Sequence, residues 1–305
     1  MALPARGRRW RPLRSIFLAP AIVFVAIFMG YPLIQTVLFS FDNSNGQFVG
    51  LQNYSSVLDG ADTVNVANLP WPPPLGTLVH NALWISIHLP LSLFAGLWLA
   101  LILREVRGSS IVKSAIFLGM VTPMIVGGVI LRFLLESGVG IVPAFFGLIG
   151  LQSLNINWMV NRDTVLLGLV FGSVWLWTGF SLIVYSAGLT TIPREYFEAA
   201  KIDGASTLKT FLRVTFPLLK PITLVVVTMT VLWELKIFDI VYIATGASGG
   251  PSLGPGGGAA DVLALQAWRY AFIGFDFGRA AVVATILTLL TLVATVSTIS
   301  YMARR

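Results

Sequence analysis

The chain of 305 residues contains no cysteine and few charged side chains. Without cysteine, disulfides, thiolate nucleophiles and cysteine-ligated metal sites are excluded. Charged residues make up only 11% of the sequence and hydrophobic residues 56%, whereas an average soluble domain is roughly 25% charged. This composition predicts an integral membrane protein whose architecture is set by the bilayer.

Motifs for nucleotide and metal chemistry are also missing. The dipeptide Gly-Lys does not occur, so the chain carries no Walker A phosphate-binding loop. The two histidines, His80 and His88, match no metal-binding spacing. We interpret both as helix-packing or interfacial residues, and we expect no metal or cofactor on this chain. Nothing pairs a nucleophile with a base, so an enzyme is not expected either.

Six apolar stretches are long enough to cross a bilayer, which takes about 20 residues of helix. They lie near residues 15–39, 80–103, 114–135, 165–189, 221–244 and 280–302. The first follows an arginine-rich start but exceeds the ~7–15 apolar residues of a signal peptide, so we interpret it as a retained span. Because helices satisfy the backbone of such runs in lipid, we predict an all-α membrane protein, one domain over residues 1–305 with six transmembrane helices.

The basic residues predict the orientation of these spans. Most of the 20 Lys and Arg residues lie before the first span, between the second and third, between the fourth and fifth, and after the sixth. Loops rich in Lys and Arg stay in the cytoplasm. We therefore expect both termini to be cytoplasmic. The net charge of +7 reflects this topology and gives no reason to expect a nucleic-acid partner.

The polar segment between the fourth and fifth spans reads EAAKIDGASTLKTFLRVTFPLLKP over residues 198–221. It resembles the cytoplasmic loop of permease subunits in binding-protein-dependent ABC importers. The resemblance implies that this loop, about residues 194–221, docks on an ATPase partner and couples it to the membrane. The matching positions are Glu198, Ala199, Ala200, Asp203, Gly204, Ala205, Phe211 and Pro217, with Leu218 and Pro221.

Local signals within this loop predict two short helices at an angle. Pro193 suits the first turn of a helix over 194–202. Gly204 is expected to end that helix, and Asp203 to cap a second one starting near Ala205. Pro217 and Pro221 are expected to fix the entry into the fifth span. An ordinary interhelical loop is the alternative reading.

The resemblance extends over most of the chain and favours sugar-importer permeases of the maltose-permease large-subunit type. It is carried by Leu18-Ala19-Pro20, by the segment 48–54, by Lys236-Ile237-Phe238-Asp239 and by the segment 275–280. It implies a homologous second permease, a pair of ATPase subunits holding ATP and Mg²⁺, and an external substrate-binding protein. It also implies the plasma membrane of a bacterium or archaeon, with its lipids, as the location.

The resemblance also suggests substrate contacts in the fourth and fifth spans. The matching positions are Ser173, Leu176, Trp177, Phe180, Thr230 and Glu234. Several residue types differ from those of the maltose-permease type, so the substrate itself does not carry over. Helix packing is the alternative role for each residue, because intramembrane Ser and Thr often join helices and Trp often anchors at an interface. Lys236 and Asp239 are expected to pair on one helical face.

Two other functions remain open at this point. The substrate of an importer could be a polyol, a glycerol phosphate or a glycosylated small acid rather than a sugar. An ion-coupled secondary transporter would need mid-membrane carboxylates and would usually contain inverted repeats. The sequence shows no repeat, and Glu234 and Asp239 are its candidate carboxylates.

Overall fold

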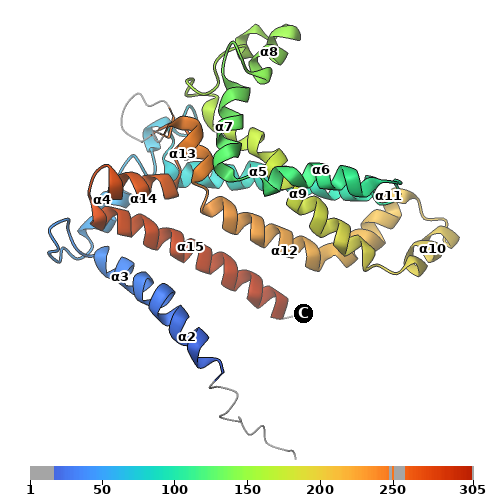
Figure 1. The fold of residues 1–305 in the computed structure, drawn as a ribbon, viewed down its shortest axis with the longest axis horizontal. Coiled ribbons are helices and arrows are strands. Elements are labelled where there is room, and N and C mark those ends of the chain that lie inside the picture. Colours follow the sequence, from blue (N-terminus) through green and yellow to red (C-terminus); the bar gives the residue numbers. More distant parts are fainter. Residues whose placement is uncertain (1–16, 247–248, 251–257, 304–305) are drawn as a thin grey trace, which may run out of the picture.

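The computed structural model describes residues 17–246, 249–250 and 258–303. Within these ranges the regular structure is helical, and Asp42 and Phe48 form an isolated β-bridge. Figure 1 shows long helices running along one direction, with α10 at one end and α14 at the other. The arginines before the first span, together with Arg304 and Arg305, lie outside the described residues.

Five stretches of helix are long and apolar enough to cross a membrane. A sixth is a pair of shorter helices, α6 (Ser109–Val121) and α7 (Met124–Leu135), which meet at a bend of 97°. Counting this pair as one broken span gives the six that the sequence predicts. Three of the continuous stretches are single helices, α5 (Thr77–Ile102), α9 (Val165–Thr190) and α15 (Phe277–Ala303). The stretch Ala19–Phe39 is made of α2 (Ala19–Val25), η1 (Ala26–Gly30) and α3 (Tyr31–Phe39), and the stretch Thr207–Leu235 of α11 (Thr207–Thr210), η4 (Phe211–Thr215) and α12 (Phe216–Leu235).

Short helices connect these spans. They are α4 (Gln52–Leu58), η2 (Val66–Asn68), α8 (Ile141–Leu148), η3 (Gln152–Leu154), α10 (Arg194–Ile202), α13 (Asp239–Thr245) and α14 (Leu263–Phe272). In Figure 1, α7 and α8 project away from the long helices, while α13 and α14 pack at the end opposite to α10.

The centre of the bundle is the contact between α5 and α9, and α6 packs along α9. Small residues allow this close approach. A Cβ on Gly96 would lie 2.3 Å from the Cβ of Ser181, and a Cβ on Gly179 would lie 2.9 Å from the Cα of Phe117. Helices in membranes associate by such close packing, since lipid offers no hydrophobic drive between them.

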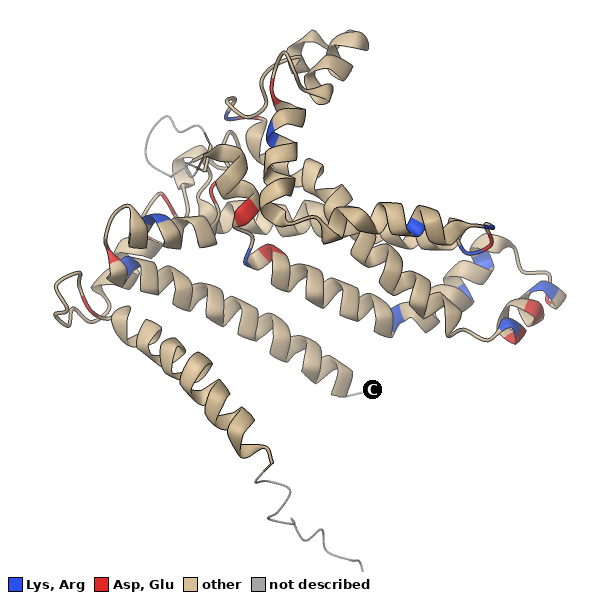
Figure 2. Ribbon diagram, in the orientation of Figure 1, with Lys and Arg blue, Asp and Glu red and all other residues tan. Residues whose placement is uncertain are grey.

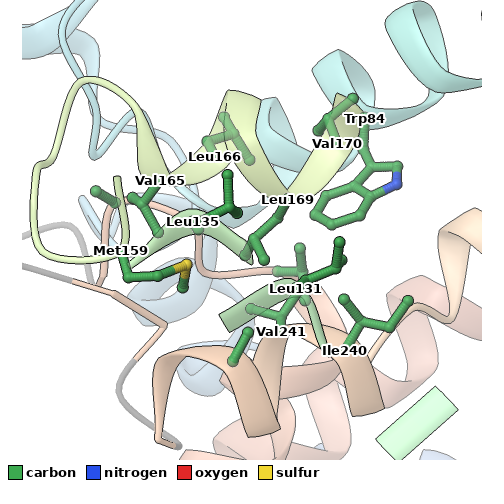
Figure 3. Packing of buried hydrophobic residues seen from close by; sticks show 14 of the residues in the cluster. Trp84, Leu131, Leu135, Met159, Val165, Leu166, Leu169, Val170, Ile240 and Val241 are labelled. Atoms are coloured by element: carbon green, nitrogen blue, oxygen red, sulfur yellow. The ribbon is translucent and has the colours of Figure 1, made fainter. Parts of the chain in front are cut away.

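Buried apolar side chains fill the space where α5, α7, α9 and α13 meet (Figure 3). Trp84, Leu131, Leu169 and Val241 are each at most 1% exposed. Figure 3 shows the ring of Trp84 lying beside Val170 and above Ile240. This packing holds the broken third span against the fourth.

Proline causes the bend in the third span. Thr122 has an extended backbone (φ −63°, ψ 127°), and Pro123 stands before the first residue of α7. The residue before a proline is pushed out of the α region by the ring, and the proline has no N–H to continue the helix.

The fifth span differs from its predicted range of 221–244. It begins at Thr207 and runs through both prolines to Leu235. The helix accommodates Pro217 with a π-turn, η4 (Phe211–Thr215), in which the N–H of Phe216 donates to the carbonyl of Phe211. Widening the turn relieves the clash between a proline ring and the carbonyl four residues earlier. The first span also has a π-turn before a proline, because η1 (Ala26–Gly30) lies directly before Tyr31 and Pro32.

The predicted pair between Lys236 and Asp239 is wrong. The helix α12 ends at Leu235, and α13 starts a new direction at Asp239. The two residues therefore share no helical face, and no ion pair joins them in the described part of the chain.

Candidate functional site

A cavity of about 370 Å³ lies near the middle of α5 and α9. Two breaks in the helices meet there, the bend between α6 and α7 and the gap between α12 and α13. Irregular backbone at membrane depth is tolerated where it is buried in protein or lines a cavity. The lining residues are Trp84, His88, Met120, Met124, Ser173, Leu176, Trp177, Trp233, Glu234, Lys236, Ile237, Phe238, Asp239 and Ile240.

Aromatic rings form one wall of this cavity. The rings of Trp177 and Trp233 have centroids 4.1 Å apart at an interplanar angle of 56°. The ring of His88 meets Trp177 edge-on at 6.3 Å, and Phe180 supports Trp233 from behind at 5.3 Å. Such a wall presents broad apolar faces with indole N–H groups at their edges.

Glu234 is the buried acid of the cavity and comes from the last turn of α12. Its side chain is 2% exposed, and its Oε1 lies 2.5 Å from Nδ1 of His88 on α5. Asn81, one turn of α5 away from Trp84, donates to the carbonyl of Glu234 at 3.1 Å and accepts from the N–H of Leu263 at 2.9 Å. The amide of Asn81 therefore fixes the broken end of α12 against α14.

Several buried polar atoms at this cavity have no hydrogen-bond partner among the described residues. They are Nε1 of Trp84, Nε1 of Trp177 and Oε2 of Glu234. Buried polar atoms in native proteins are normally paired, so each exception calls for an explanation such as a ligand or water. Two donors and one acceptor around one space are suited to a ligand that both accepts and donates hydrogen bonds.

The polar residues beside α14, in contrast, bond one another or the backbone. They are Thr63, Thr77, His80, Asp261, Gln266 and Arg269. Gln266 accepts from the hydroxyl of Thr77 and donates to that of Thr63 at 3.1 Å. His80 accepts from the N–H of Leu75 at 2.9 Å, and its Nδ1 bonds the carbonyl of Asp261 at 2.7 Å. Asp261 also pairs with Arg269. Burial raises the pKa of Asp261 to about 7, against the opposing attraction of Arg269.

The structure thus places the two histidines in different settings. His80 has the packing role expected of it, because both of its ring nitrogens bond the backbone. His88 joins α5 to α12 through Glu234 and also lines the cavity.

Four of the six predicted contact residues line the cavity. These are Ser173, Leu176, Trp177 and Glu234. Phe180 stands behind Trp233 rather than in the lining, and Thr230 is fully buried away from it. Their roles as contacts stay predictions.

The apolar length of α5 does not by itself identify Trp84 and His88 as lining residues of the cavity. A signal was present, since Thr77, Asn81, Trp84, His88 and Ser92 recur at spacings of three and four residues and are all buried. A stripe of polar and aromatic residues on one face of a spanning helix indicates the side that faces the bundle interior.

The polar loop after α9 forms a second candidate site. Its first helix, α10, has the predicted bounds. Ala200 is buried, and Phe197 packs on the cluster formed by α5, α9 and α12. Glu198, Ala199, Asp203 and Gly204 are exposed. Phe211 is half-buried against the same cluster, Pro217 is exposed, and Ala205 is half-buried.

Two details of this loop differ from the prediction. Asp203 is the C-cap residue of α10 and does not cap the helix that follows. That helix, α11 (Thr207–Thr210), is capped by Ser206, whose hydroxyl accepts from the N–H of Lys209 at 3.4 Å. The second helix is also not a separate short one, because it continues through η4 into α12. Gly204 ends α10 as predicted, with φ of 68°.

The model of the family of binding-protein-dependent transport system inner membrane components matches residues 92–304. This is well over half of the chain. The chain belongs to this family. The resemblance seen in the loop after the fourth span is thereby confirmed, and the protein is a membrane-embedded permease subunit.

Relatives of known sequence agree with this assignment. A probable ABC transporter permease of Pyrococcus horikoshii is 54% identical over 271 residues, which are 88% of this chain and 90% of the relative. The arabinooligosaccharides transport system permease AraP of Bacillus subtilis is 31% identical over 232 residues, 75% of this chain and 70% of the relative.

A solved structure shares the fold of the permease. A chain of a bacterial ABC transporter involved in the import of the acidic polysaccharide alginate superposes with a TM-score of 0.76. The match covers 96% of this chain and 95% of that chain at 19% sequence identity. The all-α membrane fold expected from the sequence is confirmed.

Proposed function

We propose that this permease forms half of the translocation pathway of an ATP-driven importer for a sugar or oligosaccharide, with the substrate bound in the central cavity. The observation that carries the proposal is the set of buried, unpartnered polar atoms on Trp84, Trp177 and Glu234 around one space. A polyhydroxylated ligand satisfies such a mixture, because each hydroxyl both donates and accepts.

The shape of the cavity supports the same substrate class. Its volume of about 370 Å³ falls in the range of small-ligand sites, roughly 300–1,000 Å³. Trp177 and Trp233 offer flat faces for the C–H surfaces of a sugar ring, and Ser173 and Glu234 offer polar groups for its hydroxyls. Phe180 and Thr230 would act from behind this layer.

The charge of the lining favours a neutral polyol or sugar over a glycerol phosphate or a glycosylated acid. Glu234 and Asp239 contribute two acids, against one cation from Lys236. The relative AraP is named for arabinooligosaccharides, which agrees with a neutral sugar as substrate.

Orientation follows from the described charges. In Figure 2 many of the ribbon positions of Lys and Arg lie at the end of the bundle that carries α10 and α11. Loops rich in basic residues remain in the cytoplasm, so we propose that this end of the bundle is cytoplasmic, and that both termini are cytoplasmic as the sequence predicts. The α14 end then faces outward, where an external binding protein would deliver substrate.

Energy would enter through α10. A pair of ATPase subunits would hold ATP and Mg²⁺ and would dock on the exposed part of the loop, about residues 194–221. The docking residues would be Glu198, Ala199, Asp203 and Gly204. Ala200, Ala205, Phe211 and Pro217 would anchor the loop to the single permease domain. Closure of the ATPase pair would move α10 and switch the cavity between inward and outward access.

A homologous second permease would complete the pathway. The apolar side chains of the first span, Ala19–Phe39, are exposed in the isolated chain. The most apolar part of this span contains no buried residue. In the assembled transporter this surface would contact lipid and the second subunit.

Purification of the tagged permease from its native membrane in mild detergent tests this proposal. We expect mass spectrometry to identify an ATPase, a second permease and a binding protein with it. Sugars that bind the binding protein should then stimulate ATP hydrolysis by the assembly. Recovery of the chain alone, with uptake driven by an ion gradient, would contradict the importer function.

A further inference from the structure

A second cavity of about 290 Å³ lies at the α10 end of the bundle, between α5, α6, α9 and the start of α10. Arg104 of the turn after α5, Lys113 of α6 and Arg194 at the start of α10 line it. The remaining lining includes Ser186 and Thr190 of α9. None of these residues belongs to the proposed substrate site or to the motif of the loop after α9.

The three cations have no carboxylate partner in the part of the chain that the structure describes. Their sequence neighbours Glu105 and Glu195 are exposed and form no ion pair with them. Lys113 is half-buried, whereas Arg104 and Arg194 are exposed. Like charges gathered in this way repel each other unless an anion binds between them.

Two further contacts show that the cavity is more than a run of surface charges. The guanidinium of Arg104 lies 4.2 Å from the centroid of the Phe197 ring on α10, which holds it at the cavity by a cation–π contact. The hydroxyl of Ser186 is buried and has no hydrogen-bond partner among the described residues. Ser186 lines the same cavity as the three cations, so a hydroxyl without a partner lies beside them.

We propose that this cavity binds a phosphate group, carried by an anionic phospholipid or by a soluble phosphorylated metabolite. Arginine forks match phosphate oxygens in geometry, and lysine neutralises the charge. Basic pockets between membrane helices on the cytoplasmic side are suited to lipid head groups. Bound phosphate joins the end of α5, the start of α6 and the first residue of α10, and so restrains the helix that carries the coupling motif.

The test uses the assembled transporter in nanodiscs of phosphatidylcholine, with and without phosphatidylglycerol. Retained lipid is measured by native mass spectrometry. In parallel, binding of glycerol 3-phosphate is measured in discs of pure phosphatidylcholine. The double variant Arg104→Gln/Lys113→Gln should weaken binding about 30-fold, as expected for the loss of two basic contacts. Arg107→Gln removes a charge from the same loop outside the cavity and should bind as the wild type does.

The outcomes separate the sources and the alternatives. Retention of phosphatidylglycerol alone assigns a lipid head group, and binding of glycerol 3-phosphate assigns a soluble ligand. The charge-conserving swap Arg104→Lys/Lys113→Arg should restore most of the affinity if the double variant fails through lost charge. Equal binding by wild type and both glutamine variants would overturn the proposal. So would loss of the ATPase subunits from the double variant with lipid binding intact, because the cations would then face protein carboxylates.

Discussion

The central cavity is built by side chains from α5, α9 and α12 that lie far apart in the sequence, whereas the α10 surface comes from one continuous segment of the chain. Several cavity residues are buried and held by neighbours, as Glu234 is by His88 and Asn81. The α10 residues Glu198 and Asp203 are exposed and bonded to no other side chain that the structure describes.

This difference separates a site for a small ligand from a site for a protein partner. A ligand site positions polar atoms in advance and leaves some of them unpaired until the ligand arrives. A docking surface keeps its polar groups in water and presents them on a rigid element. Variants of the cavity should therefore change how transport depends on substrate concentration, and variants of α10 should change transport at every concentration.

The largest effect is expected from Glu198→Lys. The side chain is exposed, so folding should be unaffected, but the reversed charge would face the ATPase partner. We expect ATP-dependent uptake in proteoliposomes to be lost at all substrate concentrations, with normal amounts of permease in the membrane. Glu195→Lys, three residues earlier on the same exposed helix, is the matched control. Normal uptake by the Glu198 variant would remove α10 from the coupling pathway.

Trp177→Ala tests the central cavity rather than the surface of α10. Removing one face of the aromatic wall should raise the half-saturating substrate concentration about 10-fold, as expected for one lost aromatic contact, while the maximal rate is largely kept. The control is Trp175→Ala, whose side chain is 40% exposed and lies outside the cavity. An unchanged concentration dependence would exclude Trp177 from the substrate site.

Asn81→Leu tests how the cavity is held together. Leucine cannot accept from the N–H of Leu263, which is then left buried and unpaired, and the carbonyl of Glu234 keeps only its backbone donors, such as the N–H of Ile237 at 3.3 Å. We expect the free energy of unfolding to fall by about 1–3 kcal/mol, seen as a lower melting temperature in detergent. Ser86→Ala on the exposed face of α5 should change it little. Equal stabilities would mean that another group satisfies the broken end of α12.

Gly204→Val should give the smallest of the four effects. The left-handed backbone at φ of 68° costs a side chain about 1–2 kcal/mol, but nothing lies within 4 Å of the added Cβ. The turn after α10 should shift, and the maximal uptake rate should fall at all substrate concentrations. Gly204→Asn, which tolerates this conformation, should retain more activity. Identical rates for both variants would show that the turn is not needed for coupling.

The sequence predicted the α10 surface better than the cavity for a physical reason. Helix signals such as Pro193 and Gly204 are local, so the bounds of α10 could be read from neighbouring residues. The cavity depends on which helices meet. Ser173, Trp177 and Glu234 were found through the resemblance, whereas Trp84 and His88 could be found only from the spacing of polar and aromatic residues along α5.

The spans themselves were predicted from their apolar length, and the errors fall at prolines and at the break after Leu235. Pro217 and Pro221 suggested a helix start, yet the π-turn before Pro217 lets the helix begin at Thr207. Pro123 has the opposite effect and bends the third span by 97°. Which of these outcomes a proline produces depends on packing with neighbouring helices.

The most direct test of the account is substrate uptake into proteoliposomes that contain the complete transporter with ATP inside and binding protein outside. The account predicts saturable uptake that requires ATP, is abolished by Glu198→Lys at every substrate concentration, and shifts to higher concentrations with Trp177→Ala. Uptake that proceeds without ATP, or that responds to the two variants in the same way, would contradict it.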